Sequence, residues 1–264
     1  RRQRQMCIRD RNDADLERYA RQAIMPDIGE EGQERLLAAR VLLVGAGGLG
    51  SPAGFYLAAA GIGHVTIIDD EQVETSNLNR QILHTAASVG MPKVKQAAQA
   101  MKALNPAMKV LPAQARLAAD NVDALVTEHD LVVDCTDNAQ TRFLLGAAAH
   151  RLRRPLVFGG AVRTEGQIAV FQSGVEGFEH TPCYCCVFPD APDASLAPGC
   201  SEAGILGPVT GVIGSFQALE AVKLILGIGT SLTGHLLLFD GRNGGFMDIA
   251  TTRRADCAVC GTAN

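Results

Sequence analysis

The sequence predicts an α/β fold, namely a Rossmann-like, mainly parallel sheet flanked by helices, with a C-terminal antiparallel β part and a four-cysteine zinc site. Short apolar runs alternate with helical patterns from about residue 40 to about residue 160, which is the order expected of a parallel sheet. After Gly160 this alternation stops and a hairpin pattern follows. Two C-x-x-C pairs lie in that second part, at a spacing typical of zinc ligands.

The strands expected in the first part are short runs rich in Val, Leu and Ile, as in buried parallel strands. They lie at residues 40–44, 64–68, 109–112, 131–135 and 156–158. Helices are expected between them, at residues 49–60, 93–104, 121–128 and 138–151. Gly61 and Pro92 support two of these boundaries, because glycine commonly ends a helix and proline suits its first turn.

The second part is expected to begin with a strand at residues 167–172 and an irregular loop at residues 181–207. Apolar residues at helical spacing predict a helix at residues 208–226, and an antiparallel pair follows at 235–240 and 246–251. We expect residues 13–264 to form a single domain, with a nucleotide-binding core at about 40–160 and the zinc, loop and β-rich part at about 161–264. Residues 1–12 carry five arginines and match nothing that follows, so we interpret them as a tail or a non-native extension.

Composition excludes several classes of protein. The chain has 264 residues, 47% of them hydrophobic, and a formal net charge of -4, which argues against a binder of duplex nucleic acid. The longest apolar stretch, residues 205–228, is interrupted by Pro208, Gln217, Glu220 and Lys223, so we expect no membrane span. The eight cysteines are clustered and no secretion signal is visible. These features favour metal binding over disulfides and a cytoplasmic location.

A glycine-rich turn follows the first predicted strand. Gly45, Gly47 and Gly50 fit the pattern G-x-G-x-x-G, and Gly48 is an additional glycine. Such a turn brings backbone N–H groups close to phosphate oxygens, and the next helix adds its positive end. Asp69 ends the second strand, where a carboxylate commonly binds ribose hydroxyls. The sequence therefore predicts a nucleotide site, without saying which nucleotide, and a nicotinamide-dependent oxidoreductase stays an alternative.

Polar residues that follow the strands bear on this choice. Asn77, Arg80, Lys93 and Asp137 each lie after a predicted strand or at a helix start, so they are expected to meet at the carboxyl edge of the sheet. Two cations and an acid near a phosphate turn suit a triphosphate with Mg²⁺ better than a nicotinamide cofactor. For any one of them alone, a solvated surface position is the better interpretation.

Together with these residues, several longer motifs resemble the ThiF/MoeB/HesA family, the bacterial relatives of ubiquitin-activating E1 enzymes. The resemblance covers about residues 18–261. It is carried by RYARQ (18–22), GAGGLGSPA (45–53), SNLNRQ (76–81), CTDN (135–138) and both cysteine pairs. It identifies the expected domain as an E1-like adenylation domain.

The resemblance implies roles for matching residues. Gly48 and its neighbours would contact ATP phosphates, Asp69 the ribose, and Asp137 a Mg²⁺ ion. Asn77, Arg80 and Lys93 would hold and neutralise the triphosphate. Arg21 would reach into the site of a neighbouring subunit, which implies a homodimer. The apolar helix at 209–226 is expected either at the dimer interface or in the core.

The activity that the resemblance implies is transfer of AMP from ATP to the C-terminal glycine carboxylate of a ubiquitin-like sulfur carrier of the MoaD or ThiS kind, with release of pyrophosphate. The pathway would be molybdopterin, thiamine or related sulfur-transfer biosynthesis. The chain ends just after Cys260, so we expect a separate protein to donate sulfur. The alternatives are the oxidoreductase, a zinc-bearing binding module without turnover, and the branch of the family that modifies a tRNA base.

Apart from Cys7, which lies in the predicted tail, the cysteines divide into three groups. Cys183, Cys186, Cys257 and Cys260 form the two C-x-x-C pairs and predict a closed, structural zinc site, whereas Cys185 does not fit the spacing. Cys200 lies in a loop where the family can carry thioester or persulfide chemistry, so a catalytic role and a bystander role both stay open. Cys135, at a strand end, is expected to be packed. Three histidines lack partners at metal or triad spacing and are expected to be surface or packing residues, namely His84, His180 and His235.

Overall fold

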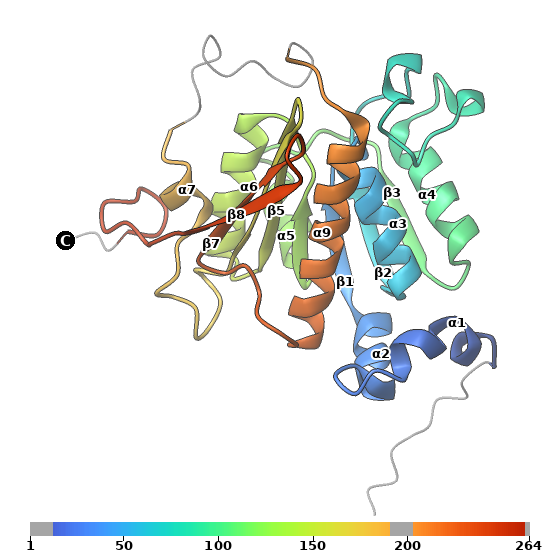
Figure 1. Cartoon of the computed structure of the whole chain (residues 1–264), viewed down its shortest axis with the longest axis horizontal. Helices are drawn as coiled ribbons and strands as arrows, with labels where there is room; N and C mark the ends of the chain where they lie inside the picture. The colour runs from blue at the N-terminus through green and yellow to red at the C-terminus, as the bar shows by residue number, and fades with distance from the viewer. Residues whose placement is uncertain (1–12, 191–202, 262–264) are drawn as a thin grey trace, which may run out of the picture.

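A single mixed sheet organises the computed structural model, which describes residues 13–190 and 203–261 (Figure 1). Within these residues the sheet has eight strands. They are β1 (Arg40–Val44), β2 (His64–Ile68), β3 (Lys109–Ala113), β4 (Leu131–Asp134), β5 (Leu156–Val162), β6 (Glu165–Phe171), β7 (His235–Asp240) and β8 (Gly245–Ala250). Their order across the sheet is β3-β2-β1-β4-β5-β6-β7-β8.

The sheet changes from parallel to antiparallel pairing at β5. Neighbouring strands from β3 to β5 pair in parallel, and those from β5 to β8 pair antiparallel. Val44 at the end of β1 lies beside Ile68 of β2 and Asp134 of β4. The carboxyl ends of these three strands therefore meet at one edge of the sheet, and the predicted Rossmann-like fold with an antiparallel extension is confirmed.

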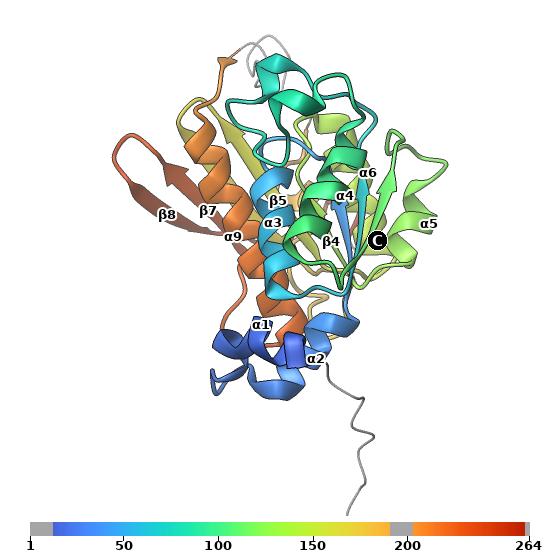
Figure 2. The same ribbon diagram turned by 90° about the vertical axis from the view of Figure 1, so that its right-hand side faces the viewer.

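Helices cover both faces of the sheet (Figures 1 and 2). The bounds are α1 (Asp13–Ala23), α2 (Gly29–Ala38), α3 (Gly50–Ala60), α4 (Lys93–Leu104), α5 (Val122–Thr127), α6 (Ala139–Arg151), α7 (Tyr184–Val187) and α9 (Gly207–Leu226). On one face lie α3, α4 and α9, and on the other α5, α6 and α7. The short helices α1 and α2 lie together at the end of the sheet where β1 begins.

Alternating side chains of the strands build two separate cores. In β1, Val41 and Leu43 belong to the cluster under α3, α4 and α9, whereas Leu42 and Val44 belong to the cluster under α5 and α6. All four are buried. A continuous apolar run is therefore the correct sequence signal for a strand covered on both faces.

The long apolar helix α9 packs against the sheet and is partly exposed, with Leu219 51% exposed. By length and composition alone it could cross a membrane, but half of its most apolar window is buried within the protein. Its Gln217 and Glu220 are fully buried. Gln217 Nε2 donates to the carbonyl of Asp134 over 2.6 Å, and Glu220 accepts from the N–H of Leu232 over 3.0 Å. These hydrogen bonds tie α9 to the sheet and to the chain that follows.

The sequence underestimated β5, which was expected to stop before Gly159 and Gly160. The strand continues through both glycines because β5 pairs with β6 as far as Val162. Glycine is required at the two positions because neighbouring side chains occupy the space of a Cβ atom. A Cβ on Gly159 would meet Gln217 at 2.4 Å, and one on Gly160 would meet Gln167 at 2.9 Å. The short helix α7 also interrupts the segment expected to be irregular. The predicted tail lies outside the described residues.

Candidate active site

The turn between β1 and α3 requires glycine at two positions for packing. Gly45 has a φ of +98°, and a Cβ there would lie 2.7 Å from the carbonyl oxygen of Cys135. A Cβ on Gly50 would lie 2.0 Å from the carbonyl oxygen of Gly45, so this glycine lets α3 start directly beside the turn. Gly47 and Gly48, like Gly45, line a cavity.

This cavity of about 830 Å³ opens where β1, β2 and β4 end. Its wall contains all the predicted nucleotide-binding residues except Gly50, that is Gly45, Gly47, Gly48, Asp69, Asn77, Arg80, Lys93 and Asp137. Gly50 shapes the turn instead, because it packs closely against the carbonyl oxygen of Gly45. The geometry thus brings together residues that are up to 92 positions apart in the sequence (137 − 45).

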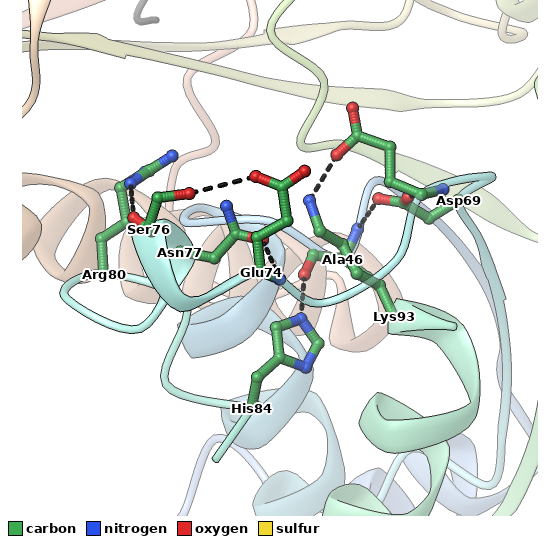
Figure 3. A network of polar contacts seen from close by, with 9 residues as sticks. Ala46, Asp69, Glu74, Ser76, Asn77, Arg80, His84 and Lys93 are labelled. Atoms are coloured by element: carbon green, nitrogen blue, oxygen red, sulfur yellow. Dashed lines mark hydrogen bonds and ion pairs between the residues drawn. The ribbon is translucent and has the colours of Figure 1, made fainter. Parts of the chain in front are cut away.

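Asp69 holds the glycine turn in place. Its Oδ2 accepts from the N–H of Ala46 and its Oδ1 from the N–H of Glu71, both over 2.8 Å (Figure 3). Burial raises the pKa of this carboxyl, while the two backbone N–H bonds act in the opposite direction. Because each carboxylate oxygen has further acceptor capacity, Asp69 can also accept from the hydroxyls of a bound ribose.

Two cations lie on the cavity wall in the segment that follows β2. The side chain of Lys93 is 4% exposed and forms an ion pair with the exposed carboxylate of Glu71. Arg80 donates to the carbonyl of Ser76 over 3.0 Å (Figure 3). It also donates to Asn79 Oδ1 over 3.0 Å. Asn77 shapes the same segment, because its Oδ1 accepts from the N–H of Glu74 over 3.0 Å. Both positive charges are therefore positioned by local bonds.

The loop after β4 presents Asp137 to the cavity. Asp134 is fully buried and its Oδ1 accepts from the N–H and the hydroxyl of Thr136, over 2.9 and 2.7 Å. Arg142 donates to the carbonyl of Thr136 over 2.6 Å. Asp137, the next residue, is exposed and lines the cavity. Its carboxylate oxygens are ligands of the kind that Mg²⁺ prefers.

Sequence reasoning missed some of the cavity wall. Gln81 is 4% exposed, lines the cavity, and its Oε1 has no hydrogen-bond partner among the described residues. Its place at the end of the SNLNRQ motif was the signal that could have identified it. Arg116 and Leu117, after β3, and Thr210 of α9 also line the cavity; no motif marked these residues.

One predicted site residue that the structure describes, Arg21, does not line this cavity. Arg21 is exposed on α1, at the end of the sheet opposite the carboxyl ends of the strands (Figure 1), so the structure does not bring it to the site of its own chain. Cys200 lies outside the described residues. Cys135 is buried and donates to Gln217 Oε1 over 3.3 Å. Burial raises the pKa of this thiol well above its usual value, in accord with the expected packing role.

The four predicted zinc ligands meet in one buried cluster. The sulfur atoms of Cys183, Cys186, Cys257 and Cys260 all lie within 4.8 Å of one another. Cys183 and Cys257 are 3.5 Å apart, and Cys186 and Cys260 are 3.3 Å apart. Tetrahedral zinc with Zn–S bonds of about 2.3 Å needs sulfurs about 3.8 Å apart, so this cluster fits the metal. Cys185 is not part of it.

A comparison with family models decides the affiliation of the chain. The model described as the ThiF family matches residues 19–259. The chain belongs to the ThiF family.

Relatives of this chain have names that contain the word adenylyltransferase. This ThiF-family chain is 46% identical over 247 residues to the sulfur carrier protein adenylyltransferase of Thermus thermophilus, covering 94% of this chain and 91% of that relative. It is 48% identical over 249 residues to adenylyltransferase and sulfurtransferase MOCS3 of Bos taurus, covering 94% of this chain and 53% of the relative. The chain thus spans about half the length of that relative. The predicted class of enzyme, an E1-like adenylyltransferase, is confirmed.

Solved structures share the fold of this ThiF-family chain. E. coli MccB superimposes with a TM-score of 0.81 at 22% identity, over 96% of this chain and 74% of that one. The crystal structure described as E. coli MccB with ATP gives a TM-score of 0.78 at 21% identity, over 93% and 75% of the two chains. At this level of identity the likeness shows the fold alone.

Proposed function

We propose that this chain transfers AMP from ATP to the C-terminal glycine carboxylate of a ubiquitin-like sulfur-carrier protein and releases pyrophosphate. The observation that carries the proposal is that Arg80, Lys93 and Asp137 line the same cavity as the glycine turn after β1. The Thermus thermophilus relative, named a sulfur carrier protein adenylyltransferase, suggests the class of acceptor. Sulfur transfer for molybdopterin, thiamine or a related product is the proposed pathway, with a separate sulfur donor protein.

The chemistry follows from charge. An acceptor carboxylate is already ionised at neutral pH, so its attack on the α-phosphorus needs no general base. The obstacle is the approach of an anion to a polyanion. Arg80 and Lys93, on the cavity wall, would offset that repulsion and stabilise the departing pyrophosphate. Lys93 would exchange its partner Glu71 for phosphate oxygens as the nucleotide binds.

The remaining cavity residues would each contact a different part of the nucleotide. The N–H groups at Gly47 and Gly48 and the start of α3 would meet phosphates, Asp69 the ribose, and Asn77 the triphosphate. Asp137 would ligate Mg²⁺, which neutralises phosphate charge when it is bound. The four-cysteine cluster would hold Zn²⁺ in a structural role, because four protein ligands leave no open position.

We further propose a cytoplasmic homodimer in which Arg21 of one copy enters the site of the other. The exposed position of Arg21 on α1, away from its own cavity, supports an action between chains. Thiol ligands need a reducing compartment to stay reduced. Cys200 is proposed to be dispensable for adenylation, since acyl-adenylate formation needs no thiol.

The test is isotope exchange between ATP and labelled pyrophosphate, measured with purified protein, Mg²⁺ and candidate carriers ending in Gly-Gly. Exchange that depends on the carrier, and is lost when its terminal glycine is deleted, is expected. Exchange with tRNA but not with carriers would favour the tRNA-modifying alternative. NAD(H) binding without exchange would favour the oxidoreductase, and carrier binding without exchange a silent module.

A further inference from the structure

His84 lies beneath the glycine turn rather than at the surface. Its side chain is buried, at 6% exposure, and its Nε2 lies 2.9 Å from the carbonyl oxygen of Ala46 (Figure 3). A carbonyl oxygen can only accept a hydrogen bond, so Nε2 carries the hydrogen. The other ring nitrogen, Nδ1, is buried and has no partner among the described residues.

The surroundings of His84 favour the neutral ring. Burial lowers its pKa, the charge of Lys93 lowers it further, and the bond to Ala46 acts in the opposite direction, with a net decrease. A neutral imidazole has a single N–H. That N–H is therefore committed to the turn, and His84 does not line the cavity itself.

The bond to Ala46 controls the direction of the next amide. The Ala46–Gly47 peptide is trans, and in a planar trans peptide the C=O and N–H groups point in opposite directions. Because the Ala46 carbonyl is held towards His84, the Gly47 N–H points away from the ring, and Gly47 itself lines the cavity. The preceding peptide is fixed as well, since Asp69 accepts the Ala46 N–H.

We propose that His84 is a positioning residue that aims the Gly47 N–H at a phosphate group of the bound nucleotide. This inference rests on the proposed function, because it requires ATP in the cavity. His84 would act entirely through the main chain of the turn. Asp69 and His84 would then form the two sides of a clamp on Ala46, one holding its N–H and the other its carbonyl oxygen.

The test compares the binding of ATP and of adenosine, which lacks phosphates, by isothermal titration calorimetry. His84→Leu should weaken ATP binding about tenfold, because a misaligned donor and an unpaired carbonyl are left at the turn, and should leave adenosine binding unchanged. His84→Gln should restore ATP binding to within about threefold, because its amide N–H can reach the same carbonyl.

His129→Leu is the matched control. His129 is also buried and bonds the carbonyl of Leu125 and the hydroxyl of Thr66, but it precedes β4 and lies outside the cavity wall. This variant should lose stability and keep the ratio of ATP to adenosine affinity.

Three results would overturn the inference. They are equal ATP affinity in His84→Leu and wild type, equal weakening of both ligands, or no rescue by His84→Gln. A wild-type protein that binds no ATP would instead overturn the proposed function, and this inference with it.

Discussion

Under the proposed function, Lys93 would receive the phosphates of the nucleotide. Its ammonium group is almost fully buried at the cavity wall, and an exposed carboxylate, Glu71, balances it. A buried charge needs a partner, and an incoming phosphate can replace Glu71 without leaving Lys93 unpaired. The pair is therefore a replaceable contact rather than a permanent element of the fold.

Removing one cation should impair catalysis much more than folding. Arg80→Ala and Lys93→Ala should each lower carrier-dependent pyrophosphate exchange about 30- to 1,000-fold, the typical effect of losing one preorganised donor. Lys95→Ala, on the exposed face of the same helix as Lys93, is the matched control and should exchange normally. If either cavity variant retains near-normal exchange, the role assigned to that cation is wrong. Asp137→Ala should show the same loss, together with a weaker dependence on Mg²⁺.

The glycines of the turn should separate into two classes by stability. Gly50→Ala should lower the free energy of unfolding by about 3 kcal/mol or more, because its Cβ would overlap the carbonyl oxygen of Gly45 at 2.0 Å. A Cβ on Gly47 would meet only Gln81 Nε2, at 3.7 Å, so Gly47→Ala should unfold at nearly the wild-type denaturant concentration. Equal midpoints for both variants in urea would contradict the distinction.

At this scale the sequence predicted the residues of the cavity better than their mutual contacts. The glycines, Asp69, Arg80, Lys93 and Asp137 belong to motifs that lie after strands, and parallel strands bring such positions to one edge. The contacts of His84 and Gln81 could not be predicted, because they depend on how the segment after β2 folds back against the turn. Neither hydrophobic periodicity nor motif spacing indicates that the segment after β2 packs against the glycine turn.

At the scale of secondary-structure elements, the cysteine cluster joins two distant segments. One pair lies around α7 and the other lies beyond β8, so a bound metal would attach the end of the chain to the body. Tyr184 of α7 adds contacts between rings, with Phe158 of β5 at 5.5 Å and Phe143 of α6 at 5.4 Å. The metal site and an aromatic cluster thus support the same corner.

Replacing one cysteine ligand should abolish zinc binding and destabilise the contact between the two segments. Cys257→Ser should reduce zinc content from one ion per chain to near zero, measured by plasma mass spectrometry, and should lower Tm by about 5 °C or more. Cys185→Ser is the matched control, because Cys185 lies beside the cluster without belonging to it, and it should keep both values. Zinc loss in Cys185→Ser would place that residue among the ligands.

Elements with a strong apolar pattern were predicted closely, and those shaped by tertiary contacts were not. Strands β1, β2 and β7 and helix α4 have the predicted bounds. The extension of β5 to Val162 follows its pairing with β6, and glycine at position 159 leaves room for Gln217, which lies 58 positions later (217 − 159). Patterns in the neighbouring sequence cannot reveal that a glycine in a strand leaves room for a side chain of a distant helix.

At the scale of the whole molecule, the position of α1 away from the cavity leads to a prediction about the homodimer. A chain that supplies Arg21 only to its partner is inactive as a monomer. Mixing Arg21→Ala with Lys93→Ala subunits, each inactive alone, should recover about a quarter of the wild-type exchange rate, since half of randomly mixed dimers contain one intact site of two. Recovery near zero after verified subunit mixing would show that Arg21 does not act in the partner's site.

The turn between β1 and α3 has a consequence for protein engineering. From Gly45 to Gly48 it carries no side chain larger than a methyl group, and it faces the cavity with its main chain. Main-chain amides are common to all residues, so substitutions there cannot encode a preference for one nucleobase over another. A designer who wants this scaffold to accept GTP should leave the turn untouched and randomise lining residues that carry larger side chains, such as Arg116 and Leu117.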